Sequence, residues 1–211
     1  MNILLGNGDG TLQKAVPYGP FTDAFSLAVA DLNGDGILDM AIADVSSGSL
    51  LLGKGNGTFR LGAPIGASGA AFFAVADFNG DHKPDLACAF NTGSSVQLLT
   101  GNGKGKFSLR STFSVSTPPI ALVAADLNGD AVPDIAIADE AVNNLHSNVT
   151  VLASSANGYV RTRYPFGDEP RLILAVDVNG DGKLDLVTEN EFNGTVDIFI
   201  NQGNGAFATQ R

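Results

Sequence analysis

The sequence has no tryptophan, one cysteine and no long apolar run. The single cysteine, Cys88, excludes an internal disulfide framework, and its apolar setting, DLACAF, favours a buried and inert thiol. No stretch approaches the roughly 18 apolar residues that a membrane-spanning helix requires. The opening MNILLGNGDG lacks both the basic and the apolar segment of a secretory signal, so we expect no signal there.

Charged residues are also scarce, at 16% of the chain, yet the formal net charge is −10. This acidity argues against nucleic acid as a partner. With 44% hydrophobic residues in a chain of 211, the protein can bury a sizeable core, as one large or two small domains. The 26 glycines favour an all-β protein of short strands and tight turns, because glycine destabilises helix interiors and enables turns.

The main organising feature is a nine-residue sequence motif, or phrase, that occurs four times. The four copies together contain 12 of the 22 acidic residues. Every copy has aspartate at positions 1, 5 and 9, asparagine at position 3 and glycine at position 4. Short apolar runs flank each copy, for example FSLAVADL before the first and DMAIAD after it. Such runs predict strands buried on both faces, with the phrase as the loop of a β-hairpin. The copies are DLNGDGILD (31–39), DFNGDHKPD (77–85), DLNGDAVPD (126–134) and DVNGDGKLD (177–185).

A second hairpin follows each phrase, because a turn rich in glycine and asparagine separates two further extended segments. Each repeat therefore predicts four antiparallel strands, and the first aspartates are 46, 49 and 51 residues apart, the length of one propeller blade. The absence of a sustained helical period excludes a helical solenoid. We expect a β-propeller of about four full blades, although a β-sandwich is an alternative. The expected single domain, 1–211, comprises a half blade at 1–20 and blades at 21–67, 68–117, 118–167 and 168–211.

The chemistry of the phrase points to a hard cation. Oxygen-bearing side chains at positions 1, 3, 5 and 9 match calcium, which takes six to eight oxygen ligands at about 2.3 to 2.6 Å. Position 7 can add a backbone carbonyl. A single copy would suit a polar turn, and magnesium is a second alternative, but four copies with three mutually repelling aspartates each favour calcium. Four calcium ions would also bring the formal charge of −10 close to neutrality.

The pairing of DxNGDGxxD with a following hairpin of the type LLGNGxGxF resembles the FG-GAP and VCBS-type repeats of integrin-α-like β-propellers, over about residues 1 to 208. The resemblance implies a calcium-binding propeller of secreted or surface proteins, with up to four Ca²⁺ ions, used in adhesion or in recognition of proteins or carbohydrates. It also implies the ligands, with the position-7 residues contributing backbone carbonyls. The four sets are Asp31, Asn33, Asp35, Ile37 and Asp39; Asp77, Asn79, Asp81, Lys83 and Asp85; Asp126, Asn128, Asp130, Val132 and Asp134; and Asp177, Asn179, Asp181, Lys183 and Asp185.

Position 6 is not glycine in the two middle copies, where it is His82 or Ala131 and position 8 becomes Pro84 or Pro133. If position 6 needs a positive φ, a non-glycine residue costs on the order of 1 kcal/mol there. A compatible proline restores roughly 0.4 to 1 kcal/mol by restricting the unfolded chain. His82 suits a solvent-facing loop residue better than a metal ligand or a base, because imidazole prefers softer metals.

We expect a binding module rather than an enzyme. The other histidine, His146, has no serine or cysteine motif beside it, and the recurring carboxylates are assigned to calcium. The leading interpretation is an extracellular or cell-surface module for adhesion or ligand recognition, with a protein or glycan as its ligand. The alternatives are a calcium-stapled spacer of a larger surface protein and a polysaccharide-acting enzyme domain. Aromatic residues at the end opposite the calcium loops are candidate ligand contacts, with packing between blades as their favoured role: Phe21, Phe90, Phe166 and Phe192.

The repeat register does not close at the ends. The opening NILLGNGDGTLQKAVPY matches the second hairpin of a blade whose first hairpin is absent. An open arc would expose apolar strands, which propellers avoid by closing the ring. We therefore expect the chain to be a part of a larger propeller that self-associates through its open end blades, with any secretion signal outside this chain.

Overall fold

The structure is a computed structural model that describes residues 1–19, 21, 23–44, 48–115, 117–140, 147–165, 170–191 and 194–210. The described part consists of β-strands and loops with one short 3₁₀ helix, η1 (Asn91–Gly93). No helix within it is long and apolar enough to cross a membrane. Three residues singled out in the sequence lie outside the described residues, as does the predicted blade boundary at 167/168: His146, Phe166 and Phe192.

The described strands form one two-stranded sheet and four four-stranded antiparallel sheets. The two-stranded sheet pairs β1 (Asn2–Ile3) with β2 (Val16–Pro17). Blade 1 contains β3 (Ser26–Ala30), β4 (Asp39–Ala43), β5 (Ser49–Gly53) and β6 (Phe59–Leu61). Blade 2 contains β7 (Phe72–Ala76), β8 (Asp85–Phe90), β9 (Ser95–Gly101) and β10 (Phe107–Ser114). Blade 3 contains β11 (Pro119–Ala125), β12 (Asp134–Asp139), β13 (Asn148–Ser155) and β14 (Gly158–Pro165), and blade 4 contains β15 (Pro170–Val176), β16 (Asp185–Asn190), β17 (Thr195–Asn201) and β18 (Phe207–Gln210).

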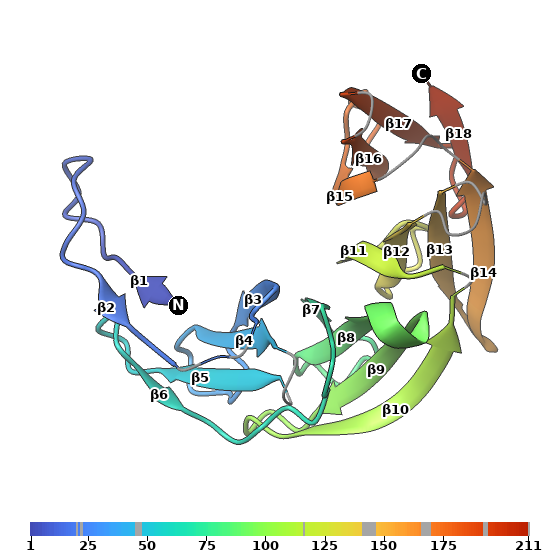
Figure 1. The fold of residues 1–211 in the computed structure, drawn as a ribbon. Helices are drawn as coiled ribbons and strands as arrows, with labels where there is room; N and C mark the ends of the chain where they lie inside the picture. The colour runs from blue at the N-terminus through green and yellow to red at the C-terminus, as the bar shows by residue number, and fades with distance from the viewer. Residues whose placement is uncertain are drawn as a thin grey trace.

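The blades follow one another along an open arc (Figure 1). Within each blade the strands lie side by side in sequence order, so that β3, β7, β11 and β15 line the inside of the arc and the fourth strands lie outside. The hairpin β1–β2 stands at one end and blade 4 at the other, and the two ends do not meet. This radial arrangement of tandem blades confirms the predicted all-β propeller architecture over a sandwich.

The hydrophobic core lies between neighbouring blades. One cluster joins blades 1 and 2 through residues such as Leu50 and Phe73, and further clusters join blades 2 and 3 and blades 3 and 4. The second strands are the most buried, and every residue of β8 and β12 is buried, because each of these strands has a blade against both faces. Phe90 is buried in the first cluster, as the packing interpretation predicted.

The prediction that the first strands are buried on both faces is wrong at the two ends of the arc. In β3 the side chains of Leu27 and Val29 are 51% and 48% exposed, although Ala28 between them packs against the core. In β15 the side chains of Leu172 and Leu174 are 43% and 47% exposed. These faces are exposed because no complete blade covers them, and burial of a first strand depends on its neighbour.

An aromatic contact recurs at the blade boundaries, and one example joins the amino-terminal hairpin to blade 1. The rings of Tyr18 and Phe59 meet edge to face with centroids 5.7 Å apart, and the Phe59 N–H donates a 3.1 Å hydrogen bond to the Tyr18 hydroxyl. The hairpin β1–β2 therefore sits against blade 1 as the outer half of a blade would. The equivalent pairs are Phe113 with Tyr159 and Tyr164 with Phe207.

Candidate metal-binding loops

Each nine-residue phrase joins the first strand of a blade to the second, as the sequence predicted. Position 6 does require a left-handed backbone: φ is 81° at Gly36, 61° at His82 and 65° at Ala131. The two non-glycine residues thus adopt the conformation that glycine adopts in the other copies. A side chain on Gly36 would meet no atom within 4 Å, so the requirement there is one of backbone conformation and not of space.

The position-1 aspartate accepts hydrogen bonds from backbone N–H groups of the same loop. Asp31 Oδ1 accepts hydrogen bonds from the N–H groups of Gly34 at 2.7 Å and Asp35 at 3.1 Å. Its Oδ2 accepts a bond from the Gly36 N–H at 2.7 Å. These bonds curl the loop around one carboxylate. The other copies repeat them, with Gly80 and His82 bonded to Asp77, Gly129 and Ala131 to Asp126, and Gly180 and Gly182 to Asp177.

The position-9 aspartate is the first residue of the second strand and ties the loop to the third strand. Asp39 is fully buried, and its Oδ2 accepts a 3.0 Å hydrogen bond from the Leu32 N–H. Its Oδ1 accepts a 2.8 Å bond from the Gly53 N–H at the end of β5. The same pair of bonds joins Asp85 to Phe78 and Gly101, Asp134 to Leu127 and Ser154, and Asp185 to Val178 and Asn201.

The two kinds of aspartate differ in their electrostatics. Burial raises the pKa of Asp39, and the nearby carboxylates of Asp35 and Asp31 raise it further, against the lowering effect of its backbone hydrogen bonds. Burial also disfavours ionisation of Asp31, but the N–H groups around it together outweigh that effect and lower its pKa. The loop of blade 2 repeats this contrast, because the pKa of Asp77 is lowered and burial raises that of Asp85.

The position-5 aspartates are exposed in all four loops. Asp81 Oδ1 accepts a 3.0 Å hydrogen bond from the Lys83 N–H, and the Lys83 ammonium group lies 3.0 Å from Oδ2. The side-chain hydrogen bond from Lys83 is the main reason that the pKa of Asp81 is lowered. In blade 1, Asp35 Oδ1 accepts a 2.9 Å bond from the Ile37 N–H.

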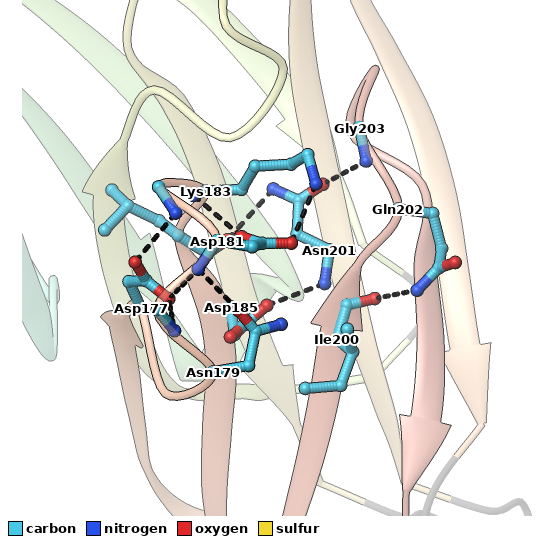
Figure 2. A network of polar contacts seen from close by, with 12 residues as sticks. Asp177, Asn179, Asp181, Lys183, Asp185, Ile200, Asn201, Gln202 and Gly203 are labelled. Atoms are coloured by element: carbon cyan, nitrogen blue, oxygen red, sulfur yellow. Dashed lines mark hydrogen bonds and ion pairs between the residues drawn. The ribbon is translucent and has the colours of Figure 1, made fainter.

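The loop of blade 4 illustrates the whole arrangement (Figure 2). Asn179 Oδ1 accepts a 2.8 Å hydrogen bond from the Asp181 N–H, and the Lys183 ammonium group lies 2.7 Å from Asp181 Oδ2. Beneath them, the Asn201 N–H donates a 2.8 Å bond to Asp185 Oδ1. Asparagine at position 3 makes the same backbone contact in blades 2 and 3.

The predicted ligands are of the chemical type that calcium binds. Every predicted ligand offers oxygen, and an ionised carboxylate has about four acceptor sites, so the backbone hydrogen bonds leave Asp31 and Asp39 with spare capacity. In the part of the chain that the structure describes, however, no three His, Cys, Asp or Glu side chains come close enough together to form a ready-made metal cluster. The four ligand sets therefore stay predictions.

The sequence interpretation missed the residue of the third strand that bonds to position 9. Ser154 is the most involved, because its N–H donates a 2.6 Å bond to Asp134 Oδ1 and its hydroxyl donates a 2.9 Å bond to Asp130 Oδ2. Its counterparts are Gly53, Gly101 and Asn201. The available signal was their common place at the start of the second turn, since two are glycines and the other two are a serine and an asparagine.

A family model described as the FG-GAP-like repeat matches residues 1–42, 31–88 and 77–137, which together span more than half of the chain. The first two matches include the loops of blades 1 and 2, and the third extends through the loop of blade 3. The sequence matches no curated protein.

Two solved structures are similar in fold. One is an Agrocybe aegerita lectin, reported as recognising non-reducing terminal N-acetylglucosamine, with a TM-score of 0.62 and 18% identity over 99% of this chain and 59% of the lectin chain. The other is a chain in the crystal structure of BBS1N in complex with ARL6DN, with a TM-score of 0.62 and 15% identity over 94% of this chain and 58% of that chain. At these identities the likeness concerns the fold alone, and this chain spans less than two thirds of the length of either.

Proposed function

Because the chain belongs to the FG-GAP-like repeat family, we propose that it is a calcium-binding β-propeller module that recognises a ligand outside the cell. The observation that carries this proposal is the repetition of one loop in four blades, each with three aspartates and an asparagine around a single turn. A polar turn needs no such set, whereas calcium takes six to eight oxygens, several of them anionic. In each loop the position-1, -3, -5 and -9 side chains would hold the ion together with the position-7 carbonyl.

A bound cation would act on the stability of a blade through the position-9 aspartate. Asp39 lies in the interior near Asp35 and Asp31, and like charges at such a site oppose one another. Calcium would supply the compensating positive charge. Because Asp39 also bonds to the third strand, an ion at this loop would stiffen three strands of its blade together.

For the ligand, we propose a glycan ahead of a protein. The support is the lectin of similar fold, which recognises a terminal sugar. FG-GAP repeats are typical of extracellular proteins, and this supports the proposed location, where calcium reaches the millimolar range in which weak extracellular modules work. The second candidate is a calcium-stapled spacer, which the partial coverage of the similar structures favours, because the recognition site can then lie elsewhere in a longer protein.

We propose a role in binding and not in catalysis. The single cysteine, Cys88, is buried, and burial raises the pKa of its thiol, which disfavours the nucleophilic thiolate. The His82 side chain is 96% exposed, and its Nδ1 lies 3.8 Å from Asp77 Oδ2, too far for a hydrogen bond that would orient the imidazole as a general base. Activity of the purified protein on a polysaccharide would contradict this part of the proposal.

The calcium proposal is tested by calorimetric titration of the metal-free protein with Ca²⁺. We expect Asp35→Ala to lower the number of bound ions by one, because Asp35 is an exposed ligand whose Oδ1 accepts one backbone hydrogen bond and whose loss leaves the other blades intact. Asp9→Ala is the matched control. Asp9 lies in a turn of the amino-terminal hairpin, bonded to Thr11 and outside the repeated phrases, so the number of ions should not change.

Two results would overturn the proposal. An unchanged stoichiometry in Asp35→Ala would mean that this loop is only a turn, and an unfolding temperature that excess chelator leaves unaltered would contradict calcium binding altogether. Recognition is tested separately by applying the calcium-loaded protein to a glycan array and to a panel of extracellular proteins. Binding to neither would favour the spacer.

A further inference from the structure

A cavity of about 500 Å³ opens between blades 2 and 3, on the side of the nine-residue loops. One wall is formed by the loop after β7, including Phe78 and His82, together with Arg110 of β10. The other wall is formed by the β13–β14 hairpin and by the loop of blade 3, and it includes Ser155 and Tyr159. This volume lies within the range of roughly 300 to 1,000 Å³ that small-molecule sites occupy.

The cavity has a cause in the sequence, which is the short second hairpin of blade 3. In blades 1, 2 and 4 the third and fourth strands are joined by five residues, at 54–58, 102–106 and 202–206. In blade 3 only Ala156 and Asn157 separate β13 from β14, and Ser155 pairs directly with Gly158. Between equivalent paired residues, four residues separate Ser154 from Tyr159, whereas five separate Gly53 from Phe59. The blade 3 turn is therefore one residue shorter than its counterparts, and its strand pairing extends one pair further toward the tip.

The longer turns close the corresponding boundaries. The Gly105 N–H of the blade 2 turn donates a 3.0 Å hydrogen bond to the Leu32 carbonyl in the loop of blade 1. The blade 4 turn is bonded to blade 3, where the Tyr164 hydroxyl donates a 3.2 Å bond to the Gly205 carbonyl. Among the described residues, no hydrogen bond joins the short turn of blade 3 to the loop of blade 2. The cavity lies at this less bonded boundary.

A β-bulge places a charged group at this opening. Leu109 and Ser111 pair with consecutive residues of β9, so Arg110 is the extra residue of β10. Bulges redirect side chains and are frequent beside functional sites. The Arg110 side chain turns toward the loop, where Nη1 donates a 2.8 Å hydrogen bond to the Phe78 carbonyl. This bond uses one of the five N–H donors of the guanidinium group and holds the group at the cavity wall.

The remaining lining combines an aromatic ring with small polar groups. Tyr159 is half-buried, its ring packs edge to face on Phe113 at 5.3 Å, and its hydroxyl lies 3.4 Å from the Pro133 carbonyl. Asp77, the one acid among the described lining residues, directs both carboxylate oxygens to N–H groups of its own loop. The groups left to meet a ligand are therefore an aromatic surface and hydrogen-bond donors and acceptors.

We propose that this cavity is a saccharide-binding site for one or two sugar rings, with Tyr159 as the apolar wall and Arg110 as the principal hydrogen-bond donor. A pyranose ring presents C–H groups on a face and hydroxyl groups around its rim, which is the pattern that an aromatic ring flanked by polar groups accommodates. The assignment rests on the proposed recognition function and gives it a location. It differs from the end opposite the calcium loops, where the sequence suggested ligand contacts.

The test uses the calcium-loaded protein and an array of mono- and disaccharides, followed by titration of the sugar that binds best. Ala156→Trp places a large side chain in the mouth of the cavity from an exposed position, and we expect it to weaken binding at least about tenfold. Lys104→Trp is the matched control, because Lys104 occupies the exposed second turn of blade 2, outside this lining. Its affinity should equal that of the original protein.

A second variant guards against a folding defect in Ala156→Trp. Arg110→Gln keeps an N–H donor for the Phe78 carbonyl but removes the guanidinium fork, and we expect about tenfold weaker binding with an unchanged circular dichroism spectrum. Sugar binding that neither variant alters would overturn this location and leave the recognition function standing. Failure of every sugar on the array to bind the unaltered protein would overturn the saccharide assignment, while the Ca²⁺ titration judges the metal loops independently.

Discussion

Asp139, the last residue of β12, is a buried acid with few compensating contacts. Its side chain is shielded from solvent, and Oδ2 accepts a 2.5 Å hydrogen bond from the Thr150 hydroxyl, while Oδ1 has no hydrogen-bond partner among the described residues. Burial raises the pKa of Asp139 to about 7, against the lowering effects of Thr150 and of the positive charges on Arg163 and Arg161. We expect Asp139→Asn, which keeps the size and can still bond to Thr150, to remove a cost of ionisation.

The sign of the effect follows from linkage. The folded protein holds the Asp139 proton more tightly than the unfolded chain, in which the pKa is 3.8. The stability from the neutral carboxyl is fully present below that value, is lost as the pH rises toward about 7, and does not change further above it. A shift of roughly three pKa units, at about 1.36 kcal/mol each, sets an upper limit of about 4 kcal/mol for this loss.

The assay is urea denaturation of the original protein and of Asp139→Asn between about pH 4 and pH 8, with chelator present throughout. The stability of the variant relative to the original should rise by a few kcal/mol over this range, about 4 at most, and level off above about pH 7. Asp181→Asn is the control, because the side-chain hydrogen bond from Lys183 lowers the pKa of Asp181 from 3.8, so the stability from that carboxylate is lost only below this value and the relative stability of the variant should hardly change over the range. A relative stability of Asp139→Asn that is constant over the range would refute the reasoning.

The other predictions concern the turns, the blade boundaries and the open ends. Gly182→Ala should lower the free energy of unfolding by about 1 kcal/mol, because φ is 82° at this position. Ala131→Gly should change the free energy of unfolding by less than about 0.5 kcal/mol, because relief of backbone strain offsets the greater flexibility of the unfolded chain. Equal effects of the two variants in urea denaturation would contradict this. Tyr164→Phe removes a hydroxyl bonded to two backbone groups of blade 4 and should cost about 1 to 2 kcal/mol, and unaltered thermal unfolding would contradict that contribution. Light scattering of the original protein should show species larger than the 21.7 kDa monomer. Leu174→Asp should dissociate them, because Leu174 lies in the exposed apolar face of β15. A monodisperse monomer of the original protein would count against self-association.

The fold was predictable because its determinants are local. The apolar runs beside each phrase and the turn inside it specify a hairpin without reference to the rest of the chain, and the left-handed position 6 follows from the glycines of the first and last copies. Burial was not predictable in the same way. Leu27 and Leu174 belong to runs as apolar as those of the inner blades, but their exposure depends on whether another blade stands beside them.

Of the candidate site, only the part formed by residues close together in the sequence was predictable. The spacing of the aspartates identifies the loop, but the partner of position 9 lies 14 residues further on for Asp39 and 20 for Asp134, and these two partners are a glycine and a serine. The cavity was visible in the sequence as the short segment SSANGY, although its consequence was not. A turn that is one residue shorter opens a space only if the neighbouring blade presents a wall there, and that is a property of the packed blades.

Phe78 connects the proposed metal loop of blade 2 to the proposed sugar site. Its N–H donates a 3.1 Å hydrogen bond to Asp85 Oδ2, at the base of the loop, and its carbonyl accepts the 2.8 Å bond from Arg110 at the cavity wall. The Phe78 ring is buried between blades 2 and 3, so this residue has little freedom to move independently. A cation that fixes Asp85 would also fix the peptide groups on either side of Phe78, and with them the guanidinium group of Arg110. Among the described residues, the short turn of blade 3 makes no bond of the kind that Gly105 makes between blades 1 and 2. If the loop of blade 2 binds a cation, the arrangement of the cavity wall would therefore depend on that loop.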